Sequence, residues 1–502
     1  MMLIREMRTV EMQAFFSCFL LCIALDVCLS ATPTPPTGKT WRIAVVGAGI
    51  GGSGYVHFLT EHEKKSGGGQ TSIEVFEQAD VPCGRVTTVK VGNDLYEEGG
   101  SILHPSNQYM RNYTEILGLK RITDDVSDGP FGIFDGVNWD YRQTGSSLWD
   151  TITLFLRYGF EPLKLNWLVD NMLNSFKSIY NIQNEGKAFT SPRDMLAAMG
   201  GQEFVQLPQM TLADYLLSKG FSLTFINELA AGAARVNYGQ NTTMGGFAGL
   251  VSLAGSQSGL WSVLGGNNQV CYGLLKRSGV RVNYNSRVSR IRRISSPGKT
   301  VYELTIGNAT RQFDIVILAS PIEKANITFV DFPVTPKPNG IFQQTIATFV
   351  EGSLNRSYFH LDGISASEFP TDVLTTEGTF FNSIGKESSV NNTLPSIPVY
   401  KVFSRDALQA SQYESLFNDS RVMTSKVWLA YPHYNPPHVI PSFVLDDQVF
   451  YVNAIEWVAS AMEMISISAR NAALLTAGVL HNVSPFDAPP TEPTMESKRD
   501  EL

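Results

Sequence analysis

A cluster of glycines directly after a short apolar run most strongly constrains how this chain can fold. Residues 43–46 are all apolar, which is typical of a strand buried on both faces of a parallel sheet. Gly47, Gly49 and Gly52 follow with the spacing G-x-G-x-x-G, and residues 50–63 are compatible with a helix. The first glycine permits a sharp turn, the second close approach of a pyrophosphate, and the third tight helix–strand packing. The pattern predicts a nucleotide cradle at a helix N-terminus.

An acid further along the chain strengthens this interpretation. A second β-like run, residues 73–76, ends at Glu77, which lies 25 residues after Gly52. An acid there binds the ribose hydroxyls of an adenosine, at a usual spacing of about 20 residues. The flexible, glycine-rich insertion at residues 64–70 accounts for the excess. The alternative is a glycine-rich turn in an ordinary α/β unit, which the agreement of strand, helix and acid disfavours.

The N-terminal segment, residues 1–31, resembles a secretory signal peptide. Two arginines precede the apolar run 14–25, and small residues follow up to Ala31. The alternative is an uncleaved anchor, which Asp26 disfavours because it ends the run short of the roughly 20 residues that cross a bilayer. No other stretch of the sequence is long and apolar enough to span a membrane.

Composition excludes several classes of protein. Removal of the N-terminal segment leaves two of the five cysteines, Cys83 and Cys271, so no disulfide framework is available. The chain is 43% hydrophobic and can bury a large core without such cross-links, and its 502 residues predict two or three domains. Its formal net charge of −8 argues against nucleic acid as a partner.

Asparagine sequons agree with passage through the secretory lumen. Eight Asn-x-Ser/Thr sites occur, at Asn112, Asn241, Asn308, Asn326, Asn355, Asn391, Asn418 and Asn482. Pro485 directly after the last of them disfavours glycosylation there. Together with the signal-like segment, the sequons predict a glycoprotein.

Further motifs after Glu77 resemble a known superfamily. Gly84-Arg85 and then Glu97-Glu98-Gly99-Gly100 follow the cradle and the acid in order. This order resembles the FAD-binding half of the flavoprotein amine oxidase superfamily. Within that superfamily the chain is most similar to the prenylcysteine oxidase family, also called prenylcysteine lyase. The likeness covers nearly the whole mature chain and is carried by residues 235–240, 258–261, 265–274, 428–437 and 459–464. Cys83 is a departure, since the family more often has glycine there.

The resemblance implies an FAD cofactor and the residues that bind it. The implied set is Gly47, Gly49, Gly52, Glu77, Arg85 at the diphosphate, Gly100, Val288 on the adenine side, Glu456 at the ribityl chain, and Met462. The helix after Glu456 would direct its N-terminus at flavin N1 and C2=O, where negative charge develops on reduction. Glu463 in this helix is either solvated, structural or directly involved. Relatives with covalent flavin place the linkage in the C-terminal third, which has no cysteine here, so we expect non-covalent binding.

The expected fold class is α/β (α+β), with a Rossmann-like FAD-binding domain interleaved with a helical and β substrate domain. Besides the first strands, β-like runs occur at residues 280–284, 314–321, 345–350 and 449–456, and a helix-compatible stretch at 459–477. The expected division is signal peptide 1–31, FAD-binding parts 41–104, 261–329 and 441–482, substrate parts 105–260 and 330–440, and tail 483–502.

Helical periodicity dominates residues 105–260. In residues 167–180, Leu168, Met172, Phe176 and Tyr180 lie on one face at helical spacing. Packing inside a helical substrate domain is the favoured reading, because basic residues are sparse on the polar side. The alternative is contact with a membrane surface or entry of a lipid.

The chain ends in Arg499-Asp-Glu-Leu502, which resembles an endoplasmic-reticulum retrieval signal. The family resemblance instead implies a lysosomal address. We expect the lysosome, with the endoplasmic reticulum lumen as a close alternative.

The resemblance implies an FAD-dependent oxidase that uses O2 to cleave S-farnesyl- and S-geranylgeranyl-cysteine to a prenyl aldehyde, cysteine and hydrogen peroxide. The alternatives are a flavin amine oxidase and a non-catalytic lipid-binding protein of the same fold. The sequence assigns no catalytic side chain. His433 and His438 lack a ligand pattern, so no metal site is expected. An elongated apolar pocket ending at the flavin is expected for the prenyl chain.

Overall fold

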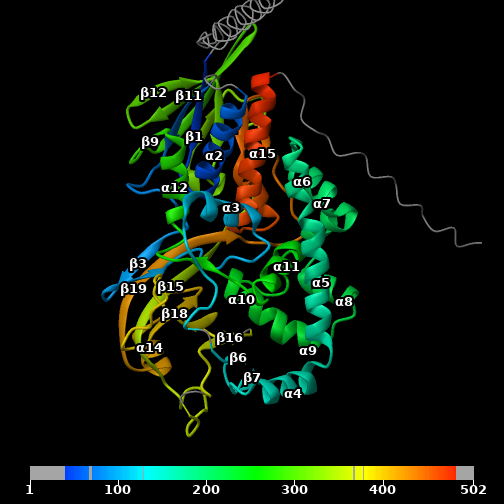
Figure 1. Ribbon diagram of the computed structural model, residues 1–502, viewed down its shortest axis with the longest axis vertical. Helices are drawn as coiled ribbons and strands as arrows, with labels where there is room; N and C mark the ends of the chain where they lie inside the picture. Colours follow the sequence, from blue (N-terminus) through cyan, green and yellow to red (C-terminus); the bar gives the residue numbers. More distant parts are fainter. Residues whose placement is uncertain (1–39, 67–70, 128, 366–367, 377, 482–502) are drawn as a thin grey trace, which may run out of the picture.

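The computed structural model describes residues 40–66, 71–127, 129–365, 368–376 and 378–481 (Figure 1). The predicted signal peptide, the Asn482 sequon and the C-terminal tetrapeptide lie outside these residues. In the described part, no helix combines the length and the apolar character needed to cross a membrane.

A six-stranded sheet forms the upper half of the molecule (Figure 1). Its strands, in spatial order, are β20 (Val444–Asp446), β21 (Val449–Tyr451), β13 (Ile315–Leu318), β1 (Trp41–Val46), β2 (Thr71–Phe76) and β9 (Arg281–Asn283). All neighbours pair in parallel except β20 with β21. Residues 43–46 and 315–318 are fully or nearly fully buried, as the unbroken apolar runs predicted.

Helices α2 (Ile50–Lys65), α12 (Gln269–Ser278) and α15 (Met462–His481) pack beside one another on this sheet, with α3 (Gln108–Leu117) against α12 and α15 (Figure 1). A second, four-stranded sheet contacts β1 and β13 through its strands β12 and β11. It consists of β12 (Ala309–Phe313), β11 (Lys299–Ile306), β10 (Val288–Ser296) and β14 (Thr328–Val330), and α13 (Ile322–Ala325) precedes β14.

The lower half contains a seven-stranded sheet (Figure 1). Its order is β19 (Phe417–Pro432), β15 (Phe342–Leu354), β18 (Val399–Ser404), β17 (Ser383–Lys386), β16 (Asp372–Thr375), β6 (Phe131–Phe134) and β7 (Trp139–Arg142). Helix α14 (Ala410–Leu416) packs on β19. Two-stranded pairs join β3 (Thr88–Val91) with β4 (Asp94–Glu97) and β5 (Arg121–Ile122) with β8 (Ser262–Val263).

Helices fill most of the segment between β7 and β8 and lie to one side of the seven-stranded sheet (Figure 1). They are α4 (Ser147–Tyr158), α5 (Glu161–Phe176), α6 (Ser178–Asn184), α7 (Pro192–Gln206), α8 (Leu212–Ser218), α9 (Leu223–Phe225), α10 (Ala231–Tyr238) and α11 (Gly246–Ala254). A 3-10 turn, residues 207–209, follows α7, and a π-helical turn, residues 226–230, joins α9 to α10.

Two sequence expectations need correction. The run 449–456 is a strand only over Val449–Tyr451, and Val452–Trp457 is a 3-10 helix, so the last helix begins at Met462 and not near residue 459. The helical stretch at 167–180 is divided between α5 and α6 at Lys177. Its predicted face is nevertheless buried, since Leu168, Met172 and Tyr180 are each less than 10% exposed.

Candidate functional site

The three glycines of the cradle meet different surroundings. At Gly47, φ is +106°, and a Cβ atom would lie 2.6 Å from the Ala319 carbonyl oxygen. At Gly52 a Cβ atom would lie 1.9 Å from the Gly47 carbonyl oxygen, so only glycine lets α2 pack this closely. At Gly49, the residue that precedes α2, the nearest atom to such a Cβ would be 3.8 Å away. The protein therefore leaves space beside Gly49, where the prediction places a pyrophosphate.

Glu77 stands at the end of β2 and holds the cradle together. Its two carboxylate oxygens accept hydrogen bonds from the backbone N–H groups of Ala48, at 2.8 Å, and Ala79, at 2.9 Å. Its backbone carbonyl accepts from Ser286 N–H. Val288, two residues further along the chain, is 3% exposed and starts β10. The segment leading to Val288 thus lies against Glu77, and the adenosine role of both residues stays a prediction.

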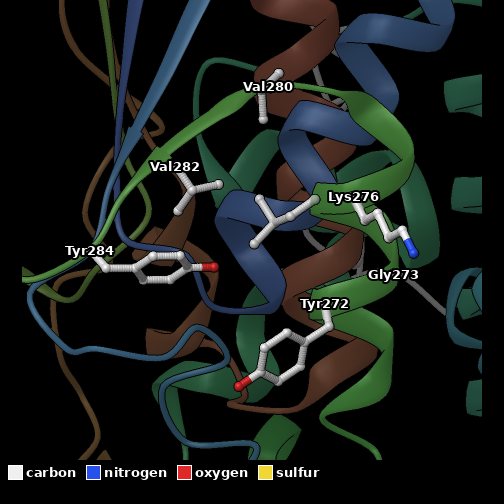
Figure 2. Close-up of a pocket in the computed structure, with 7 residues that line it drawn as sticks. Tyr272, Gly273, Lys276, Val280, Val282 and Tyr284 are labelled. Carbon is white, nitrogen blue, oxygen red and sulfur yellow. The ribbon is translucent and has the colours of Figure 1, made fainter.

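A cavity of about 410 Å³ lies at this edge of the sheet, between α12 and β9 (Figure 2). Figure 2 shows the Tyr272 ring on the α12 side of the cavity and the Tyr284 ring on the β9 side, with Val280 and Val282 on the segment that leads to Tyr284. Tyr284 directly follows Asn283, whose carbonyl accepts the Glu77 backbone N–H. The cavity is therefore next to the proposed adenosine end of the site.

Arg85 and Glu456, which are 371 positions apart, form an ion pair through Arg85 Nη2 and Glu456 Oε1. Arg85 Nη1 also donates to the Ala430 carbonyl at 2.7 Å. Burial disfavours the Arg85 cation, but the Glu456 carboxylate outweighs this effect and raises the pKa of Arg85. The fold thus joins residues that the sequence assigned to the diphosphate and to the ribityl chain.

Glu456 keeps hydrogen-bonding capacity that the described protein atoms leave unused. Its side chain is 1% exposed, and Oε1 accepts from Asn453 Nδ2 at 3.1 Å as well as from Arg85. Glu456 Oε2 and Asn453 Oδ1 are buried and have no hydrogen-bond partner in the described part of the chain. Buried polar atoms in this condition are rare in native proteins and indicate a missing partner. Two unused acceptors on neighbouring side chains are chemically suited to the hydroxyls of a bound polyol.

Aromatic side chains surround the ion pair. Tyr238 lies with its ring centroid 4.9 Å from that of Tyr431 and 5.7 Å from that of Tyr434. The Tyr434 hydroxyl donates to the Glu456 carbonyl at 2.9 Å, and the Arg85 guanidinium lies 5.9 Å from the Phe342 ring centroid. These rings form an aromatic cluster beside the ion pair.

Gly99, Gly100 and Met462 link the cradle to the last helix. A Cβ atom at Gly99 would lie 2.0 Å from the Arg85 carbonyl oxygen, so this glycine packs directly on the arginine segment. At Gly100 the nearest atom would be Met462 Cε, at 3.6 Å. Met462 is the first residue of α15. The two predicted flavin residues are therefore neighbours at the N-terminus of that helix.

Glu463 is buried, which corrects the possibility that it is solvated, and its hydrogen bonds favour the structural reading. The residue is 2% exposed, and its carboxylate accepts from the N–H groups of Tyr109 and Met110 and from the Tyr180 hydroxyl at 2.7–3.0 Å. Both N–H groups belong to the first turn of α3, so Glu463 binds α3 and α6 to α15. Burial raises the pKa of Glu463 to about 7.

The sequence assigned no role of their own to two charged residues near the site. Lys324 Nζ donates to the Leu429 carbonyl at 2.8 Å, and burial, together with the nearby Arg85 cation, lowers its pKa to about 8. Glu97, in the Glu-x-Gly-Gly motif, accepts from Asn267 N–H at 2.6 Å, and burial raises its pKa to about 7. Lys324 lies in α13, shortly after β13, and only the fold shows that it is near Arg85 and Glu456.

The described residues contain no group of three His, Cys, Asp or Glu side chains placed to hold a metal ion. His433 Nδ1 lies 3.0 Å from Gln343 Oε1, and His438 Nε2 lies 2.8 Å from the Trp457 carbonyl. Cys83 has φ of +85°, a conformation that favours glycine, and it is buried with Cys271 as a free thiol.

The cradle, its acid, the space beside Gly49 and the unused acceptors at Glu456 are typical of the Rossmann-like class of nucleotide-binding proteins. A family model described as NAD(P)-binding Rossmann-like domain matches residues 45–117. The family model described as prenylcysteine lyase matches residues 141–484, which is more than half of the chain. The chain belongs to the prenylcysteine lyase family.

Individual relatives and solved structures agree with this assignment. Prenylcysteine oxidase 1 of Pongo abelii is 39% identical over 454 residues, covering 86% of this chain and 88% of the relative. Prenylcysteine oxidase 1-like of Homo sapiens is 34% identical, with coverage of 90% and 93%. The fold is similar to that of cyclohexylamine oxidase from Brevibacterium oxydans, with a TM-score of 0.59 at 16% identity, and of a redesigned putrescine oxidase, with 0.57 at 15%. These matches cover 88% of this chain and 99% of each structure.

Proposed function

We propose that this protein is an FAD-dependent thioether oxidase that converts S-prenylcysteines and O2 to a prenyl aldehyde, free cysteine and hydrogen peroxide. The family match over residues 141–484, with relatives named prenylcysteine oxidase 1 at up to 39% identity, carries this proposal. The chemistry is an oxidation at the carbon between sulfur and the allylic double bond. Loss of hydride there leaves a cation shared by sulfur and the alkene, water adds to this carbon, and the hemithioacetal collapses to aldehyde and thiol.

The residues that would hold FAD, without a covalent bond, are those of the cradle and the ion pair. Gly49 would leave room for the pyrophosphate, Glu77 would accept from the ribose, and Glu456 with Asn453 would accept from ribityl hydroxyls. When bound, FAD supplies a hydride acceptor whose electrons pass to O2, and peroxide results. Arg85 neutralises the buried Glu456 carboxylate and brings positive charge to the diphosphate.

The protein would contribute electrostatic stabilisation and exclusion of water. The first turn of α15, at Met462, presents backbone N–H groups that favour negative charge. The tyrosine rings 238, 431 and 434 exclude bulk water from the ion pair. The two cavities identified lie elsewhere, one against β9 and one of about 670 Å³ between α2, α3 and α15. The elongated prenyl pocket stays a prediction.

Product analysis tests this proposal. Incubation of the purified protein with S-farnesylcysteine should yield farnesal, cysteine and hydrogen peroxide in equal amounts. Deuterium at the allylic C1 should slow peroxide release if hydride transfer limits turnover. Glu77→Ala should abolish the reaction through loss of FAD.

The second candidate function is an amine oxidase, which the amine oxidase folds of the structural neighbours favour. Ammonia as the stoichiometric product, with the thioether intact, would assign this function instead. Bound FAD without product from either substrate would indicate a non-catalytic lipid-binding protein.

We also propose that the protein is a glycoprotein of the secretory lumen, resident in the lysosome, with the endoplasmic reticulum lumen as the alternative. The seven sequon asparagines among the described residues are all exposed or half-buried, which supports glycosylation. Deletion of Arg499 to Leu502 should increase secretion or lysosomal delivery if the terminus is a retrieval signal. An unchanged distribution and glycan pattern would show that the terminus is not read.

Contact with a membrane surface completes the proposal, because a prenylated amino acid partitions into lipid.

A further inference from the structure

An unusual apolar surface lies on α4 and the first half of α5, at the lower edge of the molecule and away from the six-stranded sheet (Figure 1). Eight large apolar side chains, 40–75% exposed, make up what we call the α4–α5 face: Leu148, Trp149, Ile152, Phe155, Leu156, Phe160, Leu163 and Trp167. On α4 they follow the spacing i, i+1, i+4, i+7, i+8, so they form one stripe of the helix. Contiguous exposed patches of this kind mark interaction sites.

The two helices hold this face in a fixed arrangement. Gly159, with φ of +57°, turns the chain between them, and the Phe155 and Phe160 rings meet edge to face across the turn with centroids 5.0 Å apart. On the inner side, Tyr158 packs against Phe225 and its hydroxyl donates to Glu228 at 2.9 Å. The face is therefore preformed and exposed at the same time.

Each ionisable side chain from Ser147 to Trp167 is bound to a partner inside the protein. Asp150 accepts from the N–H groups of Thr144 and Gly145, and Arg157 Nε donates to Glu228 at 2.6 Å. The Ser222 N–H and hydroxyl donate to Glu161, and Lys164 Nζ donates to the Gly220 carbonyl at 2.9 Å. With two acids and two bases, this segment has no net charge.

Two hydroxyl groups of α4 are likewise hydrogen-bonded within the protein. Thr151 and Thr153 donate to the carbonyls of Ser147 and Asp150 in their own helix. Protein–protein interfaces of standard size usually form about ten direct hydrogen bonds. A face that is neutral, with its charges and these hydroxyls already satisfied, is instead complementary to the uncharged hydrocarbon and zwitterionic headgroups of a bilayer. Tryptophan with leucine and phenylalanine is the composition of helices that lie in a membrane interface.

We infer that the α4–α5 face is a membrane-binding surface that inserts its apolar side chains into the outer leaflet of a lipid bilayer without the help of anionic headgroups. This inference names the surface that makes the membrane contact of the proposed function. It rests on that contact and not on the proposed reaction, because lipid binding requires no turnover. It predicts binding to neutral vesicles that high salt leaves intact, since no ion pair with lipid is involved.

Vesicle flotation tests this inference. Full-length protein is mixed with phosphatidylcholine vesicles at low and at 1 M salt, and the bound fraction is measured after flotation. The test variant Leu156→Ser/Leu163→Ser/Trp167→Ser should bind roughly tenfold less or weaker still, because three side chains no longer leave water. The control variant Val334→Ser/Leu394→Ser/Ile397→Ser changes three exposed apolar residues elsewhere and should bind like the wild type.

Folding and function are checked separately. Both variants should retain the wild-type flavin content and unfolding temperature, and both should oxidise detergent-dispersed S-farnesylcysteine if the proposed function holds. Loss of flotation with retained oxidation supports the inference. Equal flotation of wild type and test variant, or flotation only with anionic vesicles and only at low salt, would overturn it. A wild-type dimer that the test variant converts to a monomer, without flotation of either, would show that the face joins two copies of the chain.

Discussion

At the residue scale, the glycines of the cradle have two different roles, one in packing and one in ligand binding. Gly52 serves the fold, because any side chain there would overlap the Gly47 carbonyl. We expect Gly49 to serve the ligand, because a Cβ atom there would make only an ordinary contact with protein, 3.8 Å from the Cys83 carbonyl oxygen. The same motif therefore contains one position that limits stability and one that limits binding.

Substitution of these two glycines should separate the effects. Gly49→Val should give a folded protein that no longer retains FAD, since the branched side chain occupies the pyrophosphate space. Gly52→Ala should lower the free energy of unfolding of the apoprotein by about 1–3 kcal/mol, as overpacking does. Flavin content measures the loss of FAD, and denaturant unfolding measures the free energy of unfolding of each apoprotein. The two roles would be refuted if Gly49→Val kept the wild-type flavin content. They would also be refuted if Gly49→Val destabilised the apoprotein more than Gly52→Ala does.

The Arg85–Glu456 pair connects the glycine-motif half of the chain to the 3-10 helix that follows its last strand. Glu456→Gln removes the charge but keeps the shape, and it leaves the Arg85 cation without a partner. We expect a loss of about 3 kcal/mol in the free energy of unfolding of the apoprotein.

The double variant Arg85→Gln/Glu456→Gln should recover part of this loss, because no uncompensated charge remains. A double-mutant cycle by chemical denaturation measures the coupling. Additive losses would show that the two residues stabilise the protein independently.

At the element scale, the Glu463 side chain in α15 forms hydrogen bonds with α3, and its carboxyl has a raised pKa. The folded protein binds a proton there up to about pH 7, whereas the ordinary pKa is 4.5. The unfolded chain binds fewer protons between these values, so stability falls as pH rises from 4.5 to 7. Burial lowers the pKa of His57 to about 4, and this group acts in the opposite direction, because stability increases as pH rises from 4 to its ordinary 6.5.

The contribution of Glu463 can be isolated with Glu463→Gln, which imitates the neutral carboxyl. Relative to the wild type, this variant should gain on the order of 3 kcal/mol between pH 4.5 and pH 7.5, since one pKa unit corresponds to about 1.4 kcal/mol. Unfolding free energies of both proteins at the two pH values provide the measurement, and His57 cancels in the comparison. If the difference in unfolding free energy between the two proteins were the same at both pH values, Glu463 would be ionised over the whole range.

Sequence patterns predicted elements well where one local property decides them. The buried strands at 43–46 and 315–318 and the helix after Gly49 follow from unbroken apolar runs and glycine spacing. Periodicity also identified the buried face of α5 and α6. It did not reveal the exposed α4–α5 face, because an apolar stripe shows only that a helix has a preferred side, and tertiary packing decides whether anything covers it.

At the scale of the whole molecule, the site is assembled from segments that are distant along the chain. Gly49, Arg85 and Glu456 were each predicted from a motif and a family resemblance, and the fold places the last two in direct contact. Local sequence does not report contacts over 371 positions, so neither this ion pair nor the position of Lys324 was predicted. Their energies depend on burial, which only the assembled fold determines.

In the proposed function, the cofactor lies where the two large sheets meet. The six-stranded sheet supplies the cradle, and the seven-stranded sheet supplies Phe342 and Tyr431 through β15 and β19. The central claim is therefore that a prenyl thioether bound on the second sheet reduces a flavin bound on the first.

Anaerobic titration of the purified holoprotein with S-farnesylcysteine tests this claim most directly. We predict that the visible absorbance of oxidised flavin bleaches in proportion to substrate, with one farnesal formed per flavin, and returns when O2 is admitted. Unchanged flavin absorbance at saturating thioether, or bleaching by a primary amine alone, would contradict the account.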